Sequence, residues 1–166
     1  MSQKIVSASC FSPDTCEFLS LLAKHEVCYL IVGGEAVIYY GHTRLTGDID
    51  LFYNSMEDNA IRLFAALTEF WQGKIPGIQR FEELLEEGLI LQFGVPPNRI
   101  DLINRIAGVS FADAWAARED VTMKQAGTAA TIHFIGLDDL IRNKKAAARN
   151  KDLDDLDYLR RAGQQR

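Results

Sequence analysis

The hydrophobic pattern divides the first third of the chain into alternating helices and strands. We predict a helix that begins after Ser12 and ends near His25, because Ser12 suits the N-cap, Pro13 suits the first helical position, and apolar residues follow at helical spacing. The unbroken apolar run at 27–32 predicts a fully buried strand. A short helix at 35–40, a loop at 41–47 and a strand from Asp48 are predicted next.

The rest of the chain continues with mixed elements. The pattern predicts an amphipathic helix at about 58–70, and two β-rich runs at 89–93 and 99–103 whose glycine- and proline-containing connection is typical of a hairpin. Between the helix at 58–70 and the first β-rich run, the segment 81–87 fits either a short helix or a loop. A helix near 111–118, a strand at 131–135 and two closing helices at about 137–149 and 151–161 complete the outline.

These elements predict an α/β (α+β) fold with a small mixed sheet of about four or five strands, flanked by helices. At 166 residues the chain is about one domain long. We therefore expect a single domain over 1–166, with a core at about 12–135 and a short helical C-terminal end at about 136–166.

Composition and charge limit the classes of protein to which this chain can belong. No apolar run approaches the roughly 20 residues that span a bilayer, and the start Met1-Ser2-Gln3-Lys4 lacks the apolar core of a signal peptide, so we expect a cytoplasmic protein without a membrane partner. Three cysteines without metal-site spacing predict free thiols. A net charge of -5 argues against a general nucleic-acid coat protein, although a local basic patch occurs at 142–151.

Two short segments carry the candidate chemistry. Gly33 and Gly34 follow the buried strand at 27–32, and Asp48 and Asp50 lie one residue apart on the next strand, where alternation points them to the same face. Asp101 lies between two apolar residues on a later strand and supplies a third acid. Carboxylate oxygens are the ligands that magnesium prefers, often together with substrate phosphates, so this set indicates phosphoryl or nucleotidyl transfer.

Each of these features also has a simpler interpretation. An isolated acid-x-acid pair is usually solvated charge, and a Gly-Gly pair is usually a turn; their order and spacing together favour the functional reading. Arg44 is either a surface charge of the loop or a phosphate contact. Lys144 falls on the apolar face of the 137–149 helix, where it either extends its stem to solvent or reaches into the cleft to meet a phosphate or a carboxylate.

The combination resembles a known superfamily. Gly33-Gly34, thirteen intervening residues, Asp48-Ile49-Asp50 and a later Asp101 are similar to the DNA polymerase β-like nucleotidyltransferases. More narrowly, the chain resembles the small bacterial nucleotidyltransferases of the abortive-infection and toxin–antitoxin group over roughly 27–160. That narrower resemblance rests on the segment 32–36, on a C-terminal pattern at 140–156, and on Gly41, Arg44, Thr46, Lys144, Arg149 and Lys151.

The resemblance implies a nucleotidyltransferase fold and a magnesium-dependent enzyme. Asp48, Asp50 and Asp101 would hold two Mg²⁺ ions, with Mn²⁺ as an alternative, and Asp101 would help activate an acceptor hydroxyl. Gly33 and Gly34 would cradle the triphosphate of an NTP such as ATP through backbone amides. Relatives often carry serine at the second turn position, whereas this chain has Gly34 followed by Glu35, which shifts phosphate contact toward the backbone.

Arg44 and Lys144 are the nucleotide-binding side chains that we expect besides the turn. The resemblance leaves three classes of acceptor open, because in relatives the acceptor is a tRNA end, a protein side chain or a small molecule. A cognate partner protein of a toxin–antitoxin or phage-defence system is a further expectation from the resemblance. The alternative function is a non-catalytic nucleotide- or partner-binding module that keeps the fold.

Overall fold

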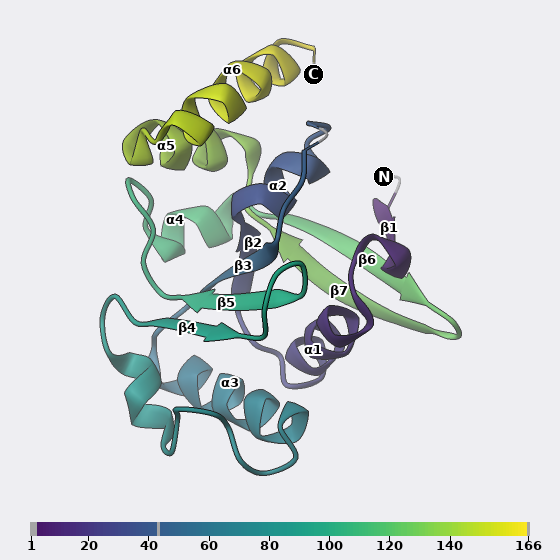
Figure 1. Ribbon diagram of the computed structural model, residues 1–166, viewed down its shortest axis with the longest axis vertical. Coiled ribbons are helices and arrows are strands. Elements are labelled where there is room, and N and C mark those ends of the chain that lie inside the picture. The colour runs from purple at the N-terminus through teal and green to yellow at the C-terminus, as the bar shows by residue number, and fades with distance from the viewer. Residues whose placement is uncertain (1–2, 43, 166) are drawn as a thin grey trace.

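A mixed seven-stranded sheet forms the centre of the computed structural model, which describes residues 3–42 and 44–165 (Figure 1). Met1, Ser2, Thr43 and Arg166 lie outside the described residues; Thr43 belongs to the predicted loop at 41–47. The strand order is β1-β6-β7-β2-β3-β5-β4. The strands are β1 (Ile5–Ser7), β2 (Tyr29–Val32), β3 (Asp48–Tyr53), β4 (Ile90–Phe93), β5 (Arg99–Ile103), β6 (Glu119–Gln125) and β7 (Thr128–Phe134).

The observed sheet corrects the predicted size of four or five strands. The buried strand, the Asp48 strand and the 89–103 hairpin are confirmed as β2, β3 and the antiparallel pair β4–β5. The additional strands are β6, which forms a hairpin with β7, and β1, which pairs in parallel with β6 over three residues. Charged and polar residues dominate β6, and only Val121 and Met123 are buried there, so its hydrophobic signal is weak.

Helices and short 3-10 turns surround this sheet. They are η1 (Ala8–Cys10), α1 (Pro13–Lys24), α2 (Gly33–Tyr39), α3 (Glu57–Phe70), η2 (Phe81–Leu85), α4 (Phe111–Ala116), α5 (Leu137–Ala147) and α6 (Asn150–Gln164). The predicted cap of α1 is confirmed, because the Ser12 hydroxyl accepts a hydrogen bond of 3.2 Å from the Thr15 amide. Helix α2 begins at Gly33, two residues earlier than predicted.

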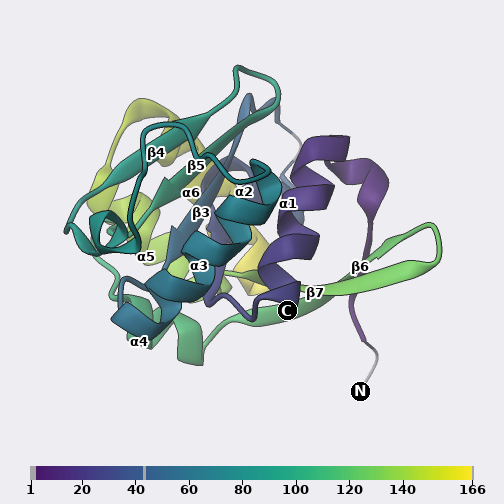
Figure 2. The ribbon, with the colours of Figure 1, turned by 90° about the horizontal axis from the view of Figure 1, so that it is seen from below.

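The helices form layers on both sides of the central strands. Figure 2 shows α1 and α3 in front of the sheet and α5 and α6 behind it. Helices α5 and α6 form an antiparallel pair at the C-terminal end, joined through Ala148 in the left-handed conformation (φ 52°). The predicted mixed α/β arrangement with a helical C-terminal end is therefore confirmed.

The core lies between these layers and fixes the orientation of β3. Ile49 and Leu51 are buried, as the alternation of the strand predicts, so Asp48 and Asp50 occupy the opposite face. Ile100 and Leu102 are buried in the same way on either side of Asp101. Burial of these flanking residues locks the strand register, because a shift by one residue would exchange the apolar and acidic faces.

The structure also bears on two predictions that were made from composition. All three cysteines are free thiols. Among the described residues, no helix has the length and apolar content needed to cross a membrane.

Candidate functional site

Strand pairing brings the three predicted acids together. Strand β3 runs parallel to β5, and in this register Asp50 lies opposite Asp101 while Asp48 lies opposite Arg99. Residues two apart on one strand share a face, so all three carboxylates project from the same side of the sheet. One oxygen of each carboxylate lies within 4.8 Å of the others, close enough for a shared metal ion.

Arg99 is the counter-ion of this acidic cluster, and sequence reasoning did not assign it a role. Its Nη2 donates to Asp48 Oδ2 at 2.6 Å and to Asp101 Oδ2 at 3.2 Å, and its Nε lies 3.0 Å from Asp101 Oδ1. The last contact lacks hydrogen-bond geometry, which leaves Asp101 Oδ1 buried without a hydrogen-bond partner. The signal for Arg99 in the sequence is its position two residues before Asp101, on the same face of the strand.

The donor set fits a hard divalent cation. Three clustered carboxylates supply oxygen ligands of the kind that Mg²⁺ takes, and the orphaned Oδ1 of Asp101 has a lone pair free for a ligand. Carboxylates directly opposite each other on paired strands repel each other. A cation between them would relieve that repulsion.

Glycine at the start of α2 allows the close approach of the acids. Gly33 has φ +64°, and a Cβ at this position would lie 2.2 Å from Asp50 Oδ2. A Cβ on Gly34 would lie 2.9 Å from Oγ1 of Thr46, whose hydroxyl donates to the Asp48 carbonyl at 3.0 Å. The Gly-Gly pair therefore packs directly against the acidic strand and the residue that leads into it.

Burial and mutual repulsion shift the protonation of the site. Desolvation, together with the negative charges of Asp48 and Asp101, raises the pKa of Asp50 to about 7. Desolvation, with the charge of Asp48, raises the pKa of Glu35 to about 6. The acidic cluster therefore holds more negative charge than its own surroundings neutralise, although Lys151 opposes the shift at Asp50.

A small cavity of about 170 Å³ opens beside Asp48. It lies between the N-terminal segment, the start of α2 and the strands of the acids. Its lining residues are Cys10, Phe11, Ser12, Thr15, Glu35, Thr46, Asp48, Ile49, Pro97 and Arg99. This volume is below the roughly 300 Å³ at which small-molecule pockets begin, so the cavity has room for only part of a ligand of that size.

Lys144 and Arg44 share the partner Asp155 and form no ion pair with the acidic cluster. Lys144 is only 3% exposed, and its Nζ lies 3.1 Å from Asp152 Oδ1 and 3.0 Å from Asp155 Oδ2. Arg44 pairs with Asp155 Oδ2 as well. The interpretation of Lys144 as a solvent-reaching lysine is therefore wrong. Its ion pairs with Asp152 and Asp155 join α5 to α6 and do not involve the acidic cluster.

The connection between α5 and α6 brings further basic groups near the acids. The charge of Lys151 lowers the pKa of Asp50, and the charge of Asp50 contributes to the raised pKa of Arg149, whose main partner is Asp152 at 2.7 Å. Both residues belong to the basic patch seen in the sequence at 142–151. They lie beside the turn at Ala148, within two residues of the break that the sequence predicts between the helices at 137–149 and 151–161.

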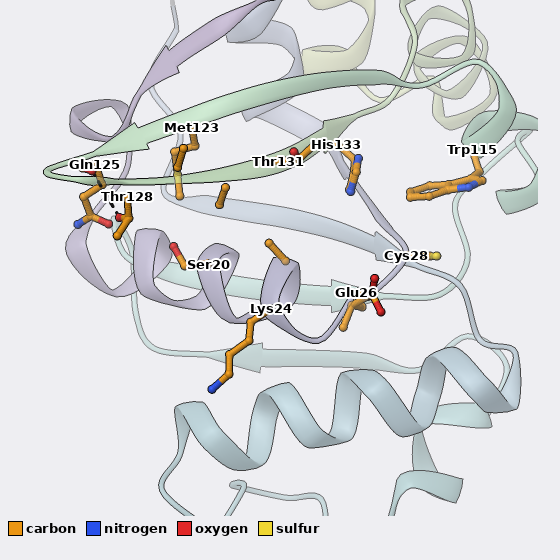
Figure 3. Close-up of a pocket in the computed structure, with 14 residues that line it drawn as sticks. Ser20, Lys24, Glu26, Cys28, Trp115, Met123, Gln125, Thr128, Thr131 and His133 are labelled. Atoms are coloured by element: carbon orange, nitrogen blue, oxygen red, sulfur yellow. Dashed lines mark hydrogen bonds between the residues drawn. The ribbon is translucent and has the colours of Figure 1, made fainter.

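A larger cavity of about 670 Å³ lies elsewhere, between α1 and the β6–β7 hairpin. Figure 3 shows Trp115 and His133 at one end of it and Gln125 and Thr128 at the other. Glu26 is the one carboxylate among its lining residues, so it lacks the clustered oxygen ligands of a divalent-metal site. The acidic cluster is thus the candidate functional site even though its own cavity is smaller.

Neither the models of known protein families nor the curated proteins include a match to this chain. The residues of the acidic cluster and their geometry therefore carry the functional assignment.

Proposed function

We propose that this chain is a magnesium-dependent nucleotidyltransferase of the DNA polymerase β-like type. It would transfer a nucleoside monophosphate from an NTP to an acceptor hydroxyl and release pyrophosphate. The observation that carries the proposal is the convergence of Asp48, Asp50 and Asp101 within 4.8 Å, against the glycine pair at the start of α2. Order, spacing and geometry then agree with the resemblance seen in the sequence.

The chemistry supplied by divalent metal at these three carboxylates is neutralisation of phosphate charge and alignment of the attacking and leaving oxygens. Asp101 accepts the proton of the acceptor hydroxyl. The acceptor oxygen forms a bond to the α-phosphorus, and the bond from that phosphorus to the oxygen bridging the β-phosphate breaks. Pyrophosphate leaves with that oxygen, so the label of an α-phosphate would remain on the acceptor.

Backbone amides at the start of α2 and the ammonium of Lys151 give the substrate its remaining contacts. Backbone amides at Gly33 and Gly34 receive the triphosphate, and Lys151 lies where its charge already acts on Asp50. Arg44 and Lys144 contribute through Asp155, which fixes the loop before β3 against α6. An RNA end, a protein side chain or a small molecule remains the proposed class of acceptor, and a cognate partner protein of a toxin–antitoxin or phage-defence system is the proposed setting.

Transfer of labelled nucleotide tests the proposal. Wild-type protein, incubated with cell extract and each NTP in turn, should transfer label from the α-phosphate but not from the γ-phosphate, and EDTA should abolish the transfer. The Asp50→Asn variant should lose it, whereas Asp58→Asn, at a largely exposed acid on α3, should keep it. Transfer that persists in folded Asp50→Asn would refute the assignment.

A non-catalytic nucleotide- or partner-binding module is the second candidate. The small cavity beside Asp48 favours it, since part of an NTP must then lie outside the cavity. Calorimetric titration with ATP and Mg²⁺ separates the two functions. Binding that depends on Asp50, without transfer of label to any component of the extract, would make the module the better description.

A further inference from the structure

We propose that Arg99 is a built-in cation that occupies the acidic centre in the absence of metal, and that a divalent ion must displace it to bind. This inference rests on the proposed function, since it concerns the same three carboxylates. It adds a residue that sets the affinity for metal and thereby the metal concentration at which the site fills.

The contacts of Arg99 place its guanidinium among the metal-ligand oxygens. It reaches both carboxylates that flank the centre, Asp48 at 2.6 Å and Asp101 at 3.0 Å. The strand register produces this geometry, because Arg99 lies opposite Asp48 and two residues from Asp101 on the same strand. A divalent ion that binds the same carboxylate oxygens would compete with the guanidinium for them.

Charge balance shows why such a cation is needed. Three carboxylates lie within 4.8 Å of one another, and Asp101 is only 6% exposed. In the described part of the chain, Arg99 is the basic residue that forms ion pairs with this cluster. One positive charge against three negative ones stabilises the empty centre only in part, so a divalent ion gains more from the site than the guanidinium does.

The fit of Arg99 is also incomplete, as expected of an occupant that can leave. Its Nε is buried without a hydrogen-bond partner, and so is Asp101 Oδ1, although these atoms lie 3.0 Å apart. The side chain of Arg99 is about 30% exposed, so a path to solvent is open to it. Arg99 also lines the cavity beside Asp48, and its departure would enlarge the space available to a nucleotide.

Binding of Mn²⁺ to the metal-stripped 166-residue chain tests the proposal without any assay of activity. Electron paramagnetic resonance of free Mn²⁺ gives the Kd for wild type, Arg99→Met and Arg99→Lys. Methionine keeps much of the apolar stem and removes the competing charge, so we expect its Kd to fall about tenfold. Lysine keeps the charge but cannot bridge both carboxylates as a planar fork, so its Kd should fall by a smaller factor.

Arg118→Met is the matched control, because Arg118 pairs with Asp120 and stacks on Trp115, away from the acids. Its Mn²⁺ affinity should equal that of wild type. In EDTA, Arg99→Met should melt at a lower temperature than wild type, and Mn²⁺ should raise its melting temperature more than it raises that of wild type. If Arg99→Met does not fold without metal, Arg99→Lys decides the comparison.

Unchanged or weaker Mn²⁺ binding in the folded Arg99 variants would overturn the proposal. That result would leave the proposed function standing if Asp50→Asn still abolished Mn²⁺ binding. Tighter binding in Arg99→Met without transfer of labelled nucleotide by wild type would support the role of Arg99 and refute the enzyme. Absence of Mn²⁺ binding in every variant would overturn both.

Discussion

The acidic centre depends on the identity of single residues at contact distance. Alternation along β3 was sufficient to predict that Asp48 and Asp50 share a face, because the apolar residues between and after them must be buried. Asp101 could be proposed from its apolar neighbours alone. The position of Arg99 between the acids could not, because it depends on the parallel register of β3 and β5, which no local pattern records.

Gly33 has a role that its sequence context only suggests. Its positive φ favours glycine, and the space where a Cβ would lie is filled by the carboxylate of Asp50. The first requirement concerns the backbone alone. The second links the turn to the site, because any side chain at Gly33 would have to move Asp50.

Gly33→Ala should therefore damage both stability and metal binding. We expect the free energy of unfolding to fall by ~1–3 kcal/mol from the left-handed backbone, and Mn²⁺ affinity to fall because Asp50 is displaced. Gly77→Ala is the control: Gly77 has φ +78° but open space where the Cβ would lie, so only stability should change. Equal Mn²⁺ affinity in the two folded variants would contradict the steric link between Gly33 and Asp50.

At the scale of elements, strongly patterned segments were predictable and weakly patterned ones were not. Helices α1 and α3 and strands β2, β3 and β5 have dense apolar positions at regular spacing. Strand β6 has alternating Val121 and Met123 among charged residues, and β1 is three residues long. Their pairing with β7 and β6 supplies the missing stabilisation, so only the assembled sheet identifies them. The alternation of β6 before Ala126-Gly127 was the available signal.

The helical pair α5–α6 is held by buried charge. Lys144 contacts Asp152 and Asp155, which are themselves almost fully buried and which also pair with Arg149 and Arg44. Ring contact between Tyr158 and His42, with centroids 4.4 Å apart, attaches α6 to the same loop that contains Arg44. The C-terminal helices thus hold the segment that leads into β3 and its acids.

Lys144→Met should destabilise the fold more than it alters the acidic centre. Removing the ammonium leaves two buried carboxylates with one arginine partner each, so we expect the free energy of unfolding to fall by ~3 kcal/mol in urea titrations. Lys145→Met, at the exposed neighbour on α5, should change it by less than about 0.5 kcal/mol. Similar values for the two variants would show that the buried network contributes little.

At the scale of the whole molecule, the chain carries excess negative charge, and part of this charge is concentrated in the acidic centre. The net charge is -5, and three of the carboxylates lie within 4.8 Å of one another. Repulsion of this kind opposes folding. The empty site lowers the stability of the folded chain, and a bound cation raises it. The stability of the whole chain is therefore coupled to binding of the cation.

This coupling predicts how the stability of the whole protein changes with pH. The pKa of Asp50 rises from an ordinary value of 3.8 to about 7 in the folded chain, so between about pH 4 and 7 the folded state binds more protons than the unfolded state. The free energy of unfolding therefore falls as pH rises through this window, by on the order of 2–4 kcal/mol for a shift of this size. At pH 5 most of this contribution to the free energy of unfolding remains, and at pH 8 it has been lost completely.

Asp50→Asn removes the titrating group and keeps the shape of the side chain. Without metal, this variant should be more stable than wild type at pH 8, and the difference should shrink at pH 5, whereas Asp58→Asn should follow wild type at both pH values. Magnesium should stabilise wild type at pH 8 by favouring the ionised carboxylate, and should have little effect on Asp50→Asn. Urea unfolding at both pH values, in EDTA and in Mg²⁺, measures these differences. If Asp50→Asn gains no more at pH 8 than at pH 5, Asp50 is not the group whose ionisation opposes folding, and the repulsion within the centre is neutralised by Arg99 alone.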